Sequence, residues 1–226
     1  MKPLKTELQD AETLRDLGSA SVQIVHDLKN QLNGLKLYAT FLRKRLEKGE
    51  RPADELETVK KLIGGLDRTA ADLSMIVEYG HPPAIKKQTG TDLEKIVREV
   101  ATNLNESPAV SGSLESSIIV EGSGAALVGD FDATMLASAL KSISIGALKM
   151  AAGKTPNAPL HIQLSGEKSD GVIDWKLSEV SDHDPFHSFA GSNEIRLSLA
   201  ARIIEAHGGS ATREDGALRV RLPLTS

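Results

Sequence analysis

Apolar residues recur every three or four positions from about Leu4 to Leu46, with polar residues between them. This spacing places the apolar side chains along one face of an α-helix. It predicts one long helix in which Leu28, Leu32 and Leu35 turn inward and the polar side chains around them face solvent.

A second helix follows a short break in this pattern. Gly49 ends the first repeat, and Pro52 stands near the first turn of the next helix, where proline is favoured. The new apolar repeat continues to the sequence "GHPP", whose two prolines cannot continue a helix. Residues 1–80 therefore predict a helical hairpin. Two helices leave apolar surface uncovered, so we expect two copies to pair as a homodimer with a four-helix bundle.

Beyond residue 83 shorter helical and strand-like segments alternate, which indicates an α+β domain with helices against one sheet. Thr91 and Glu94 match a capping box at the start of a helix. The domain boundary is expected near residues 80–88, which gives domains at 1–80 and 88–226. The expected helices are 91–104, 131–151 and 193–207, and the expected strands are 116–122, 125–130, 160–166, 171–179 and 217–224.

The composition excludes several classes of function. The 226 residues carry a net charge of -4 and no strongly basic run, so no nucleic-acid partner is expected. The absence of cysteine excludes disulfides, thiolate catalysis and zinc–thiolate sites, and it suits a cytoplasmic protein. No segment has the length and apolarity of a signal-peptide core or a membrane span, so no membrane association is expected.

The segment "SVQIVHDLKNQLNGL" concentrates polar chemistry on the first helix. His26 and Asn30 are four residues apart and share a helix face, and Asp27 stands beside the histidine. A neutral imidazole nitrogen is a good nucleophile, and a neighbouring carboxylate can hold the other ring N–H and stabilise positive charge. A solvated helix face can carry the same residues, so the segment alone leaves both interpretations open.

In its context, "HDLKN" resembles the dimerisation and phosphoacceptor region of the two-component histidine kinases. In that family an acidic residue follows the phosphorylated histidine, and Asn or Thr stands four positions after it. "DATMLASALKSISIGALKMA" is similar to the N-box helix of the family's ATP-binding domain, and "LSLAARIIEAHGGSATREDGALRVRLPL" to its last helix and strands. The resemblance implies a histidine-kinase ATPase-like α/β sandwich after the hairpin, with His26 as the phosphoacceptor.

The motifs that hold ATP in this family are altered here. Gly146 stands where the N box has its metal-binding asparagine, and the earlier asparagine position holds Ser142. Glycine offers no side-chain oxygen to a metal. The next family motif has two spaced glycines, yet no glycine lies between Gly171 and Gly191.

The lid motif of the family has glycines where Glu194 and Arg196 stand. At these positions glycine would let backbone N–H groups approach phosphate, whereas the larger side chains obstruct that approach. The Glu194 carboxylate would also repel phosphate. The three losses together favour a fold that has lost ATP binding.

Two other patterns are rejected. The sequence "AAGKT" lacks P-loop spacing, and no metal site is expected in the loop residues Asp182, His183, Asp184 and His187.

The resulting hypothesis is a dimeric histidine phosphotransfer protein that exchanges a phosphoryl group between His26 and aspartates of a response regulator receiver domain. Asp27 would orient the imidazole, Asn30 would position the phosphoryl group or a water, and Lys29 could offer charge to phosphate. No cofactor of its own is expected, and magnesium would arrive in the regulator's acidic pocket. The alternatives are a divergent but active histidine kinase, a regulator phosphatase, and a non-catalytic pseudokinase scaffold that binds a signalling partner.

Overall fold

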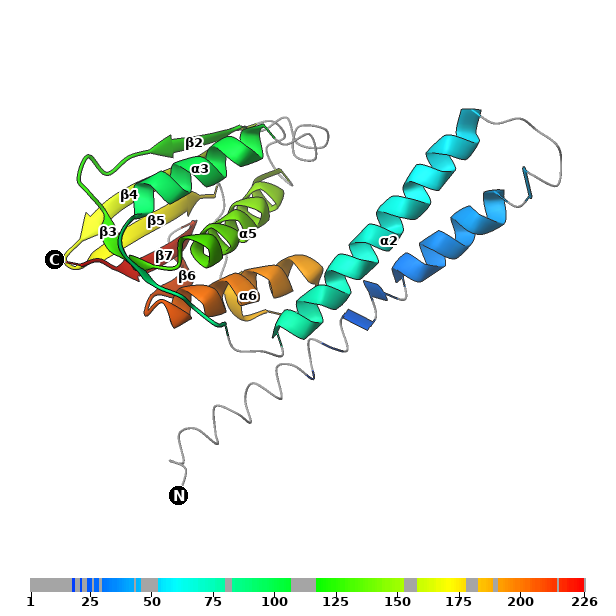
Figure 1. Ribbon diagram of the computed structural model, residues 1–226. Helices are drawn as coiled ribbons and strands as arrows, with labels where there is room; N and C mark the ends of the chain where they lie inside the picture. Colours follow the sequence, from blue (N-terminus) through cyan, green and yellow to red (C-terminus); the bar gives the residue numbers. More distant parts are fainter. Residues whose placement is uncertain are drawn as a thin grey trace, which may run out of the picture. The chain divides into compact units, whose positions relative to one another are not determined.

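A computed structural model of the chain divides it into two compact units (Figure 1). One unit comprises Met1–Pro82 with Phe189–Ser192, and the other comprises Pro83–Ser188 with Asn193–Ser226. Among the helices in the described part of the chain, none is long and apolar enough to cross a bilayer. The described residues are 18, 21, 24–25, 27–28, 30–42, 44–45, 53–79, 83–106, 117–152, 158–177, 183–188, 191–214 and 216–225.

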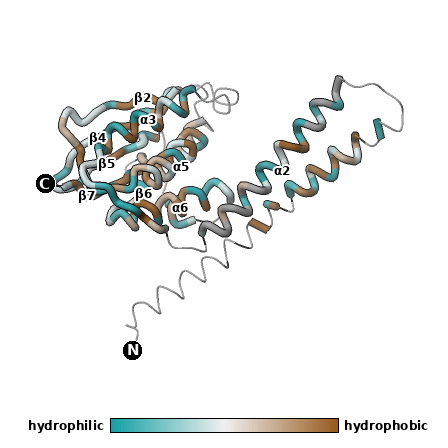
Figure 2. Tube along the Cα trace, in the orientation of Figure 1, coloured by the Kyte–Doolittle hydropathy of each residue, from teal (hydrophilic) through white to brown (hydrophobic). Residues whose placement is uncertain are grey.

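The first unit contains a helical hairpin. Its N-terminal helix is described between residues 18 and 45, and its second helix is α2 (Ala53–Tyr79). Figure 2 shows hydrophobic and hydrophilic residues alternating along the N-terminal helix. On both helices a series of buried and half-buried positions recurs at alternating steps of three and four residues, the spacing of helices packed side by side. The series is Ile24, Leu28, Gln31, Leu35, Tyr38, Leu42 and Arg45 on the first helix, and Glu55, Thr58, Leu62, Gly65, Thr69 and Asp72 on α2.

A glycine lets the two helices of the hairpin approach closely. A Cβ atom added at Gly65 would lie 2.6 Å from Leu35 Cδ2, well inside van der Waals contact. The Leu35 side chain therefore packs directly on the backbone of α2. Any larger residue at Gly65 would have to displace it.

Leu32 lies outside the buried series, so the expectation that it turns inward with its neighbours is wrong for the single chain. It is 55% exposed, because it stands on a face that the other helix of the hairpin does not cover. An uncovered apolar surface of this kind supports the expected homodimeric four-helix bundle, which stays a prediction. Among the described residues of the hairpin, the other large apolar side chains left exposed are Val25, Leu37, Phe41, Ile63 and Leu66.

The second unit is an α/β domain built on a mixed five-stranded sheet with the strand order β2-β4-β5-β7-β6. In this sheet β2 runs parallel to β4, and the other neighbours are antiparallel. A separate antiparallel pair joins β1 and β3. The elements in chain order are β1 (Gln88–Asp92), α3 (Leu93–Asn105), β2 (Ile118–Glu121), β3 (Val128–Phe131), α5 (Ala133–Ala152), β4 (Leu160–Glu167), β5 (Asp170–Lys176), the 3-10 helix η1 (Pro185–His187), α6 (Ser192–Ala206), β6 (Ser210–Glu214) and β7 (Ala217–Pro223).

Helices α3, α5 and α6 lie on one face of the sheet (Figure 1) and enclose the apolar core with it. The central strand β5 buries Trp175 completely, and its indole N–H donates to Ser144 Oγ on α5 at 2.9 Å. Ser144 Oγ in turn donates to the Leu140 carbonyl one turn earlier, at 2.8 Å. The chain's single tryptophan thus has its polar atom satisfied inside the core, where it links β5 to α5.

Some element boundaries differ from the sequence prediction. The N-cap of α3 is Asp92, whose carboxylate accepts from the N–H groups of Glu94 and Lys95. The capping box expected at Thr91 is therefore wrong, because this residue belongs to β1 and pairs with β3. Phe131 likewise lies in β3, so α5 begins later than expected. Neither β1 nor β6 follows an apolar alternation, and each becomes a strand only by pairing with a partner elsewhere in the chain.

A buried histidine joins the end of α6 to the start of α5. His207 Nδ1 donates to the Ile203 carbonyl at 2.7 Å, and Nε2 accepts from the Asp132 N–H at 3.0 Å. A neutral imidazole has one donor and one acceptor, so these contacts fix its tautomer. Asp132 itself accepts from the N–H groups of Met135 and Lys86, and these two bonds hold the pKa of Asp132 below its usual range. The histidine of the "AHGG" sequence therefore has a structural role.

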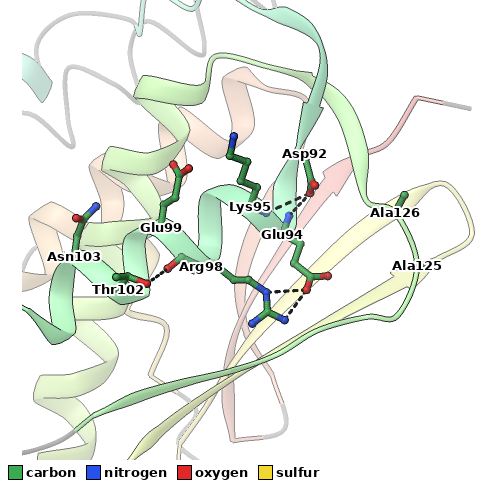
Figure 3. Close-up of a pocket in the computed structure, with 9 residues that line it drawn as sticks. All are labelled: Asp92, Glu94, Lys95, Arg98, Glu99, Thr102, Asn103, Ala125 and Ala126. Carbon is green, nitrogen blue, oxygen red and sulfur yellow. Dashed lines mark hydrogen bonds and ion pairs between the residues drawn. The ribbon is translucent and has the colours of Figure 1, made fainter.

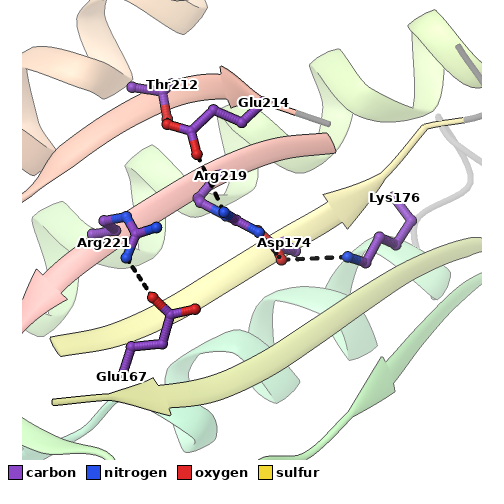
Figure 4. A network of polar contacts seen from close by, with 7 residues as sticks. All are labelled: Glu167, Asp174, Lys176, Thr212, Glu214, Arg219 and Arg221. Atoms are coloured by element: carbon purple, nitrogen blue, oxygen red, sulfur yellow. Dashed lines mark hydrogen bonds and ion pairs between the residues drawn. The ribbon is translucent and has the colours of Figure 1, made fainter. Parts of the chain in front are cut away.

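The open face of the sheet carries a network of charged side chains (Figure 4). Asp174 on β5 is the direct cross-strand partner of Arg219 on β7, which donates from Nε at 2.7 Å and from Nη2 at 2.9 Å. Lys176 and Glu214 lie against this pair, and only 9% of the Asp174 side chain and 18% of the Arg219 side chain are exposed. Burial alone would raise the pKa of Asp174, but Arg219 outweighs it and holds that pKa below its ordinary value of 3.8.

Replacing Arg219 by methionine is expected to lower the free energy of unfolding by about 2 to 3 kcal/mol at neutral pH, because a mostly buried carboxylate loses its main partner. The loss should shrink as the pH falls. In the wild type the lowered pKa of Asp174 stabilises the fold above pH 3.8, and this contribution fades below that value. In the variant burial raises the same pKa, so protonation relieves the cost. Urea unfolding at several pH values measures both effects.

The matched control is Arg221→Met. Arg221 Nη1 lies 2.6 Å from Glu167 Oε2, but the two side chains are 33% and 48% exposed. An exposed ion pair contributes about 0 to 1 kcal/mol, so this variant should stay within that range of the wild type. Equal destabilisation by both substitutions, or a pH-independent loss for Arg219→Met, would contradict the role assigned to the buried pair.

Candidate functional site

The described residues of the "HDLKN" motif, Asp27, Leu28 and Asn30, lie on the N-terminal helix of the hairpin. His26 and Lys29 fall outside the described residues, while Asp27 and Asn30 are helical. Asp27 is half-buried, and the Asn30 side chain lies at the helix surface. The roles that the sequence suggests for these four residues stay predictions.

One turn after Asp27, a polar side chain that no sequence pattern had singled out reaches across the hairpin. Gln31 Nε2 donates to Asp72 Oδ2 on α2 at 2.8 Å, and Thr69 Oγ1 donates to Gln31 Oε1 at 2.8 Å. Asp72 is only 3% exposed. A carboxylate only accepts hydrogen bonds, so the amide NH₂ must face Asp72 and the amide oxygen must face Thr69. The available signal was Gln31, which interrupts the mostly apolar series of the N-terminal helix, whereas Thr69 and Asp72 belong to a series on α2 that is itself largely polar.

The second unit places Gly146, one of the altered family positions, where α5 meets α6. Gly146 is buried on α5, and a Cβ atom there would lie 2.9 Å from Leu197 Cδ2 and 3.1 Å from Leu197 Cδ1. Leu197 of α6 therefore packs directly onto the α5 backbone. Ser142, one turn earlier on α5, and Arg196 on α6 are half-buried. The position that the resemblance assigns to a metal-binding side chain is filled by an apolar contact between helices.

Glu194, in the first turn of α6, is held by two side chains from the preceding loop. His183 Nε2 lies 3.0 Å from Glu194 Oε1, and the Ser188 hydroxyl donates to Glu194 Oε2. The Glu194 side chain is 22% exposed. Beside it, Lys149 of α5 donates to Asn193 Oδ1. The start of α6, where free N–H groups would favour an anion, thus carries a carboxylate kept in place by its neighbours.

The loop before α6 contains η1, which is capped by Asp184. This carboxylate accepts from the Phe186 N–H at 2.9 Å and contacts His187 Nδ1 at 2.8 Å. Within the described ranges, no group of three or more carboxylate, imidazole or thiol side chains could hold a metal ion. Asp182 lies outside those ranges. The expected absence of a metal site in this loop stays a prediction.

A separate hollow of about 710 Å³ lies beside α3 (Figure 3). One wall is the polar surface of α3, and the other is the connection between β2 and β3 at Ala125 and Ala126. Arg98 in this wall is paired with Glu94, because its Nε and Nη2 donate to Glu94 Oε1 at 2.9 Å and 2.6 Å. Neither α5 nor α6 lines the hollow, so it is distinct from the position that the resemblance assigns to ATP.

Solved histidine kinase structures share this fold. Histidine kinase ThkA, crystallised in complex with the response regulator protein TrrA, matches 100% of this chain and 67% of its own, with a TM-score of 0.74 and 19% identity. The Acinetobacter baumannii histidine kinase AdeS matches 89% of this chain and 98% of its own, with a TM-score of 0.64 and 13% identity. Full-length ShkA in complex with AMPPNP matches 88% of this chain and 46% of its own, with a TM-score of 0.55 and 17% identity.

No protein-family model and no curated protein sequence matches this chain. The sequence identities to the solved structures are low, so the likeness establishes the fold. It confirms the kinase-like architecture implied by the "HDLKN" segment and by the last helix and strands. The chain has the fold of a histidine kinase core, with a helical hairpin followed by an ATPase-like α/β domain on a five-stranded sheet.

Proposed function

We propose that this chain is a histidine phosphotransfer protein of a two-component phosphorelay. It exchanges a phosphoryl group between His26 and an aspartate of a response regulator receiver domain, and it draws that group from the regulator and not from ATP. The observation that supports this most directly is the packing of Leu197 against Gly146, which fills the place where a kinase of this fold would present a metal-binding side chain.

The surroundings of Glu194 support the same conclusion. A glycine in this position would let backbone N–H groups approach phosphate. Glu194 instead brings a negative charge, and its contacts with His183 and Ser188 keep that charge at the start of α6. A nucleoside triphosphate would have to displace this cluster, and the Glu194 carboxylate would repel its phosphates.

The chemistry at His26 takes a nucleophile from this chain and a leaving group from the regulator. A neutral imidazole nitrogen attacks the phosphorus of the aspartyl phosphate, a P–N bond forms, and the bond from phosphorus to the carboxylate oxygen breaks. Asp27 holds the other ring N–H and stabilises the positive charge that develops on the ring. Asn30, at the helix surface, orients phosphoryl oxygens, and Lys29 adds positive charge near them. Magnesium enters with the regulator's acidic pocket.

The proposed partner and assembly follow from the fold and from the hairpin surface. ThkA, which has this fold, was crystallised with a response regulator. The exposed apolar side chains of the hairpin, among them Leu32, Phe41 and Leu66, would be covered in a homodimeric four-helix bundle. Light scattering on the purified chain should give the mass of a dimer, and a monomer at micromolar concentration would contradict this assembly.

A divergent but active histidine kinase is the second candidate. The whole fold is kinase-like, and ShkA, which shares it, was crystallised with the nucleotide analogue AMPPNP. Lys149, three residues after Gly146 on α5, also retains a positive charge near the altered position. This candidate requires that Leu197 and Glu194 move aside when nucleotide binds.

Incubation of the full chain with a regulator radiolabelled on its aspartyl phosphate tests the proposal. We expect label to move onto the chain as acid-labile phosphohistidine, and no label to be taken from Mg-ATP. Label from Mg-ATP would favour the divergent kinase. Loss of label from the regulator as inorganic phosphate, with none on the chain, would favour a phosphatase. A chain that binds the regulator and changes none of its label would favour the scaffold.

A further inference from the structure

We propose that Gln31, Thr69 and Asp72 form a positioning layer. The layer sets the orientation of the helix that carries His26 against α2, and through it the rate of phosphoryl transfer from a docked regulator. The inference rests on the proposed function. These three residues act through the helix and touch neither the imidazole nor the phosphoryl group.

The layer joins a polar residue of the N-terminal helix, which stands between Leu28 and Leu35 in the buried series, to two polar residues of α2. Gln31 occupies a core position of the N-terminal helix, and both ends of its amide are hydrogen-bonded. Its Nε2 donates to Asp72 Oδ2 at 2.8 Å, and its Oε1 accepts from Thr69 Oγ1 at 2.8 Å. Sliding this helix by one turn, about 5.4 Å, would separate the amide from both partners. It would also withdraw a donor from a carboxylate that is 3% exposed, which is costly in a packed interior. Polar groups at core positions are known to specify helix register in this way.

Shape complementarity next to the layer selects the same register. Leu35 lies four residues after Gln31, and Gly65 lies four residues before Thr69, so the two form the adjacent layer of the hairpin. Leu35 packs on the backbone at Gly65, where a Cβ atom would lie 2.6 Å from it. The polar and apolar layers therefore fix the same axial and rotational setting of the two helices.

This setting matters for a reaction between two proteins. Gln31 lies one turn after Asp27 on the same helix face, so a rotation of the helix carries the whole "HDLKN" segment with it. A helix is about 10 to 12 Å wide. A stable interface covers about 800 Å² on each partner. A regulator that docks on this helix therefore needs a second contact surface, and α2 is the element packed directly against it. Misplacing reacting atoms by about 1 Å can cost on the order of 10²-fold in rate.

Substitutions within the pair of Gln31 and Asp72 test the layer. Gln31→Glu places a second carboxylate against the buried one, and like charges repel there. Asp72→Asn keeps an acceptor for the Gln31 amide. The double variant Gln31→Glu/Asp72→Asn restores the contact with its direction reversed, because the new carboxylate accepts from the new amide and from the Thr69 hydroxyl. All four chains are assayed at full length with a radiolabelled regulator and, separately, with phosphoramidate as a small donor.

We expect Gln31→Glu to lower the maximal transfer rate at saturating regulator by at least about tenfold. The regulator concentration at half-maximal rate should change by less than about threefold, because no exposed side chain of either helix is replaced. Labelling by phosphoramidate should be unchanged, since a small donor needs no fixed relation between the helices. Asp72→Asn and the double variant should transfer at close to the wild-type rate.

Two hydroxyl deletions provide a matched control. Thr69→Val removes a hydroxyl that bonds across the hairpin, whereas Thr40→Val removes one that donates to Lys36 O within its own helix at 2.7 Å. Only Thr69→Val should slow transfer from the regulator. Circular dichroism of each variant at the assay temperature establishes that the helices are folded.

The outcomes separate this inference from the proposed function. A wild type that phosphoramidate labels and no regulator labels contradicts the proposed function, and the positioning layer falls with it. If both the regulator and phosphoramidate label the wild type, and the regulator labels Gln31→Glu at the wild-type rate, the positioning layer alone is overturned. A double variant as slow as Gln31→Glu, or a phosphoramidate rate that falls in parallel, would also overturn it, because either result indicates general loss of structure.

Discussion

Substitution of His26 by glutamine is expected to abolish labelling by a phosphorylated regulator. Glutamine retains a polar side chain on the helix, but its amide nitrogen is a donor only and cannot attack phosphorus. Removing a nucleophile should slow the reaction by at least about 10³-fold, which is indistinguishable from background over the time in which the wild type becomes labelled. Autoradiography of the two chains side by side, at saturating regulator, is the measurement.

His161→Gln is the control for this experiment. His161 on β4 is also an imidazole beside a carboxylate, with Nδ1 at 3.1 Å from Glu121 Oε1, and its side chain is 44% exposed. It therefore presents an imidazole and a carboxylate outside the "HDLKN" segment. The His161→Gln variant should be labelled as strongly as the wild type. Full labelling of His26→Gln would place the acceptor elsewhere and would overturn the proposed function.

Introducing asparagine at Gly146 is expected to destabilise the second unit by about 3 kcal/mol and to confer no binding of Mg-ATP. The new Cβ atom would lie 2.9 Å from Leu197 Cδ2. Overpacking of this kind costs about 1 to 3 kcal/mol. Burying an amide without prepared partners costs about 1 to 3 kcal/mol more. The better helix propensity of asparagine returns only a few tenths of a kcal/mol, so packing decides the sign.

Unfolding in urea can be followed through Trp175, the single tryptophan, which lies in the core of the same unit. A thermal shift with Mg-ATP reports nucleotide binding. The control is Gly124→Asn, because Gly124 has a φ of +71 degrees and no atom within 4 Å of an added Cβ. Asparagine tolerates this left-handed conformation, so the control should lose less than about 1 kcal/mol. A stable Gly146→Asn chain that gains a shift with Mg-ATP would favour the divergent kinase.

Most of the fold could be predicted from local patterns. The apolar period of the hairpin and the helices α3, α5 and α6 follow from spacing along the chain, because a helix bonds within itself. The strands β1 and β6 could not be predicted in this way. β1 pairs with β3, and β6 pairs with β7, so their conformation depends on partners and not on their own apolar pattern. The misassigned cap at Thr91 has the same origin, since pairing extends β1 to Asp92.

In the candidate site, too, some features follow from local patterns and others depend on residues distant in the sequence. The "HDLKN" motif is a local spacing of polar residues, and the resemblance alone places the glycines of the family's lid at Glu194 and Arg196. The contacts that these positions make are not visible in the sequence. Leu197 closes on Gly146, and the His183 side chain engages Glu194, only because folding brings α5, α6 and the loop before α6 together.

The sequence by itself determined a two-helix hairpin, an α/β domain after it, and a histidine with acidic and amide neighbours on the first helix. Backbone geometry alone converts spacing into a helix face, so these features needed no tertiary information. The tertiary structure decided which polar groups meet. Gln31 and Asp72 are 41 residues apart, and Asp174 and Arg219 are 45 residues apart. No local rule relates such pairs, because chain packing selects them through the cost of leaving a buried polar group without its partner.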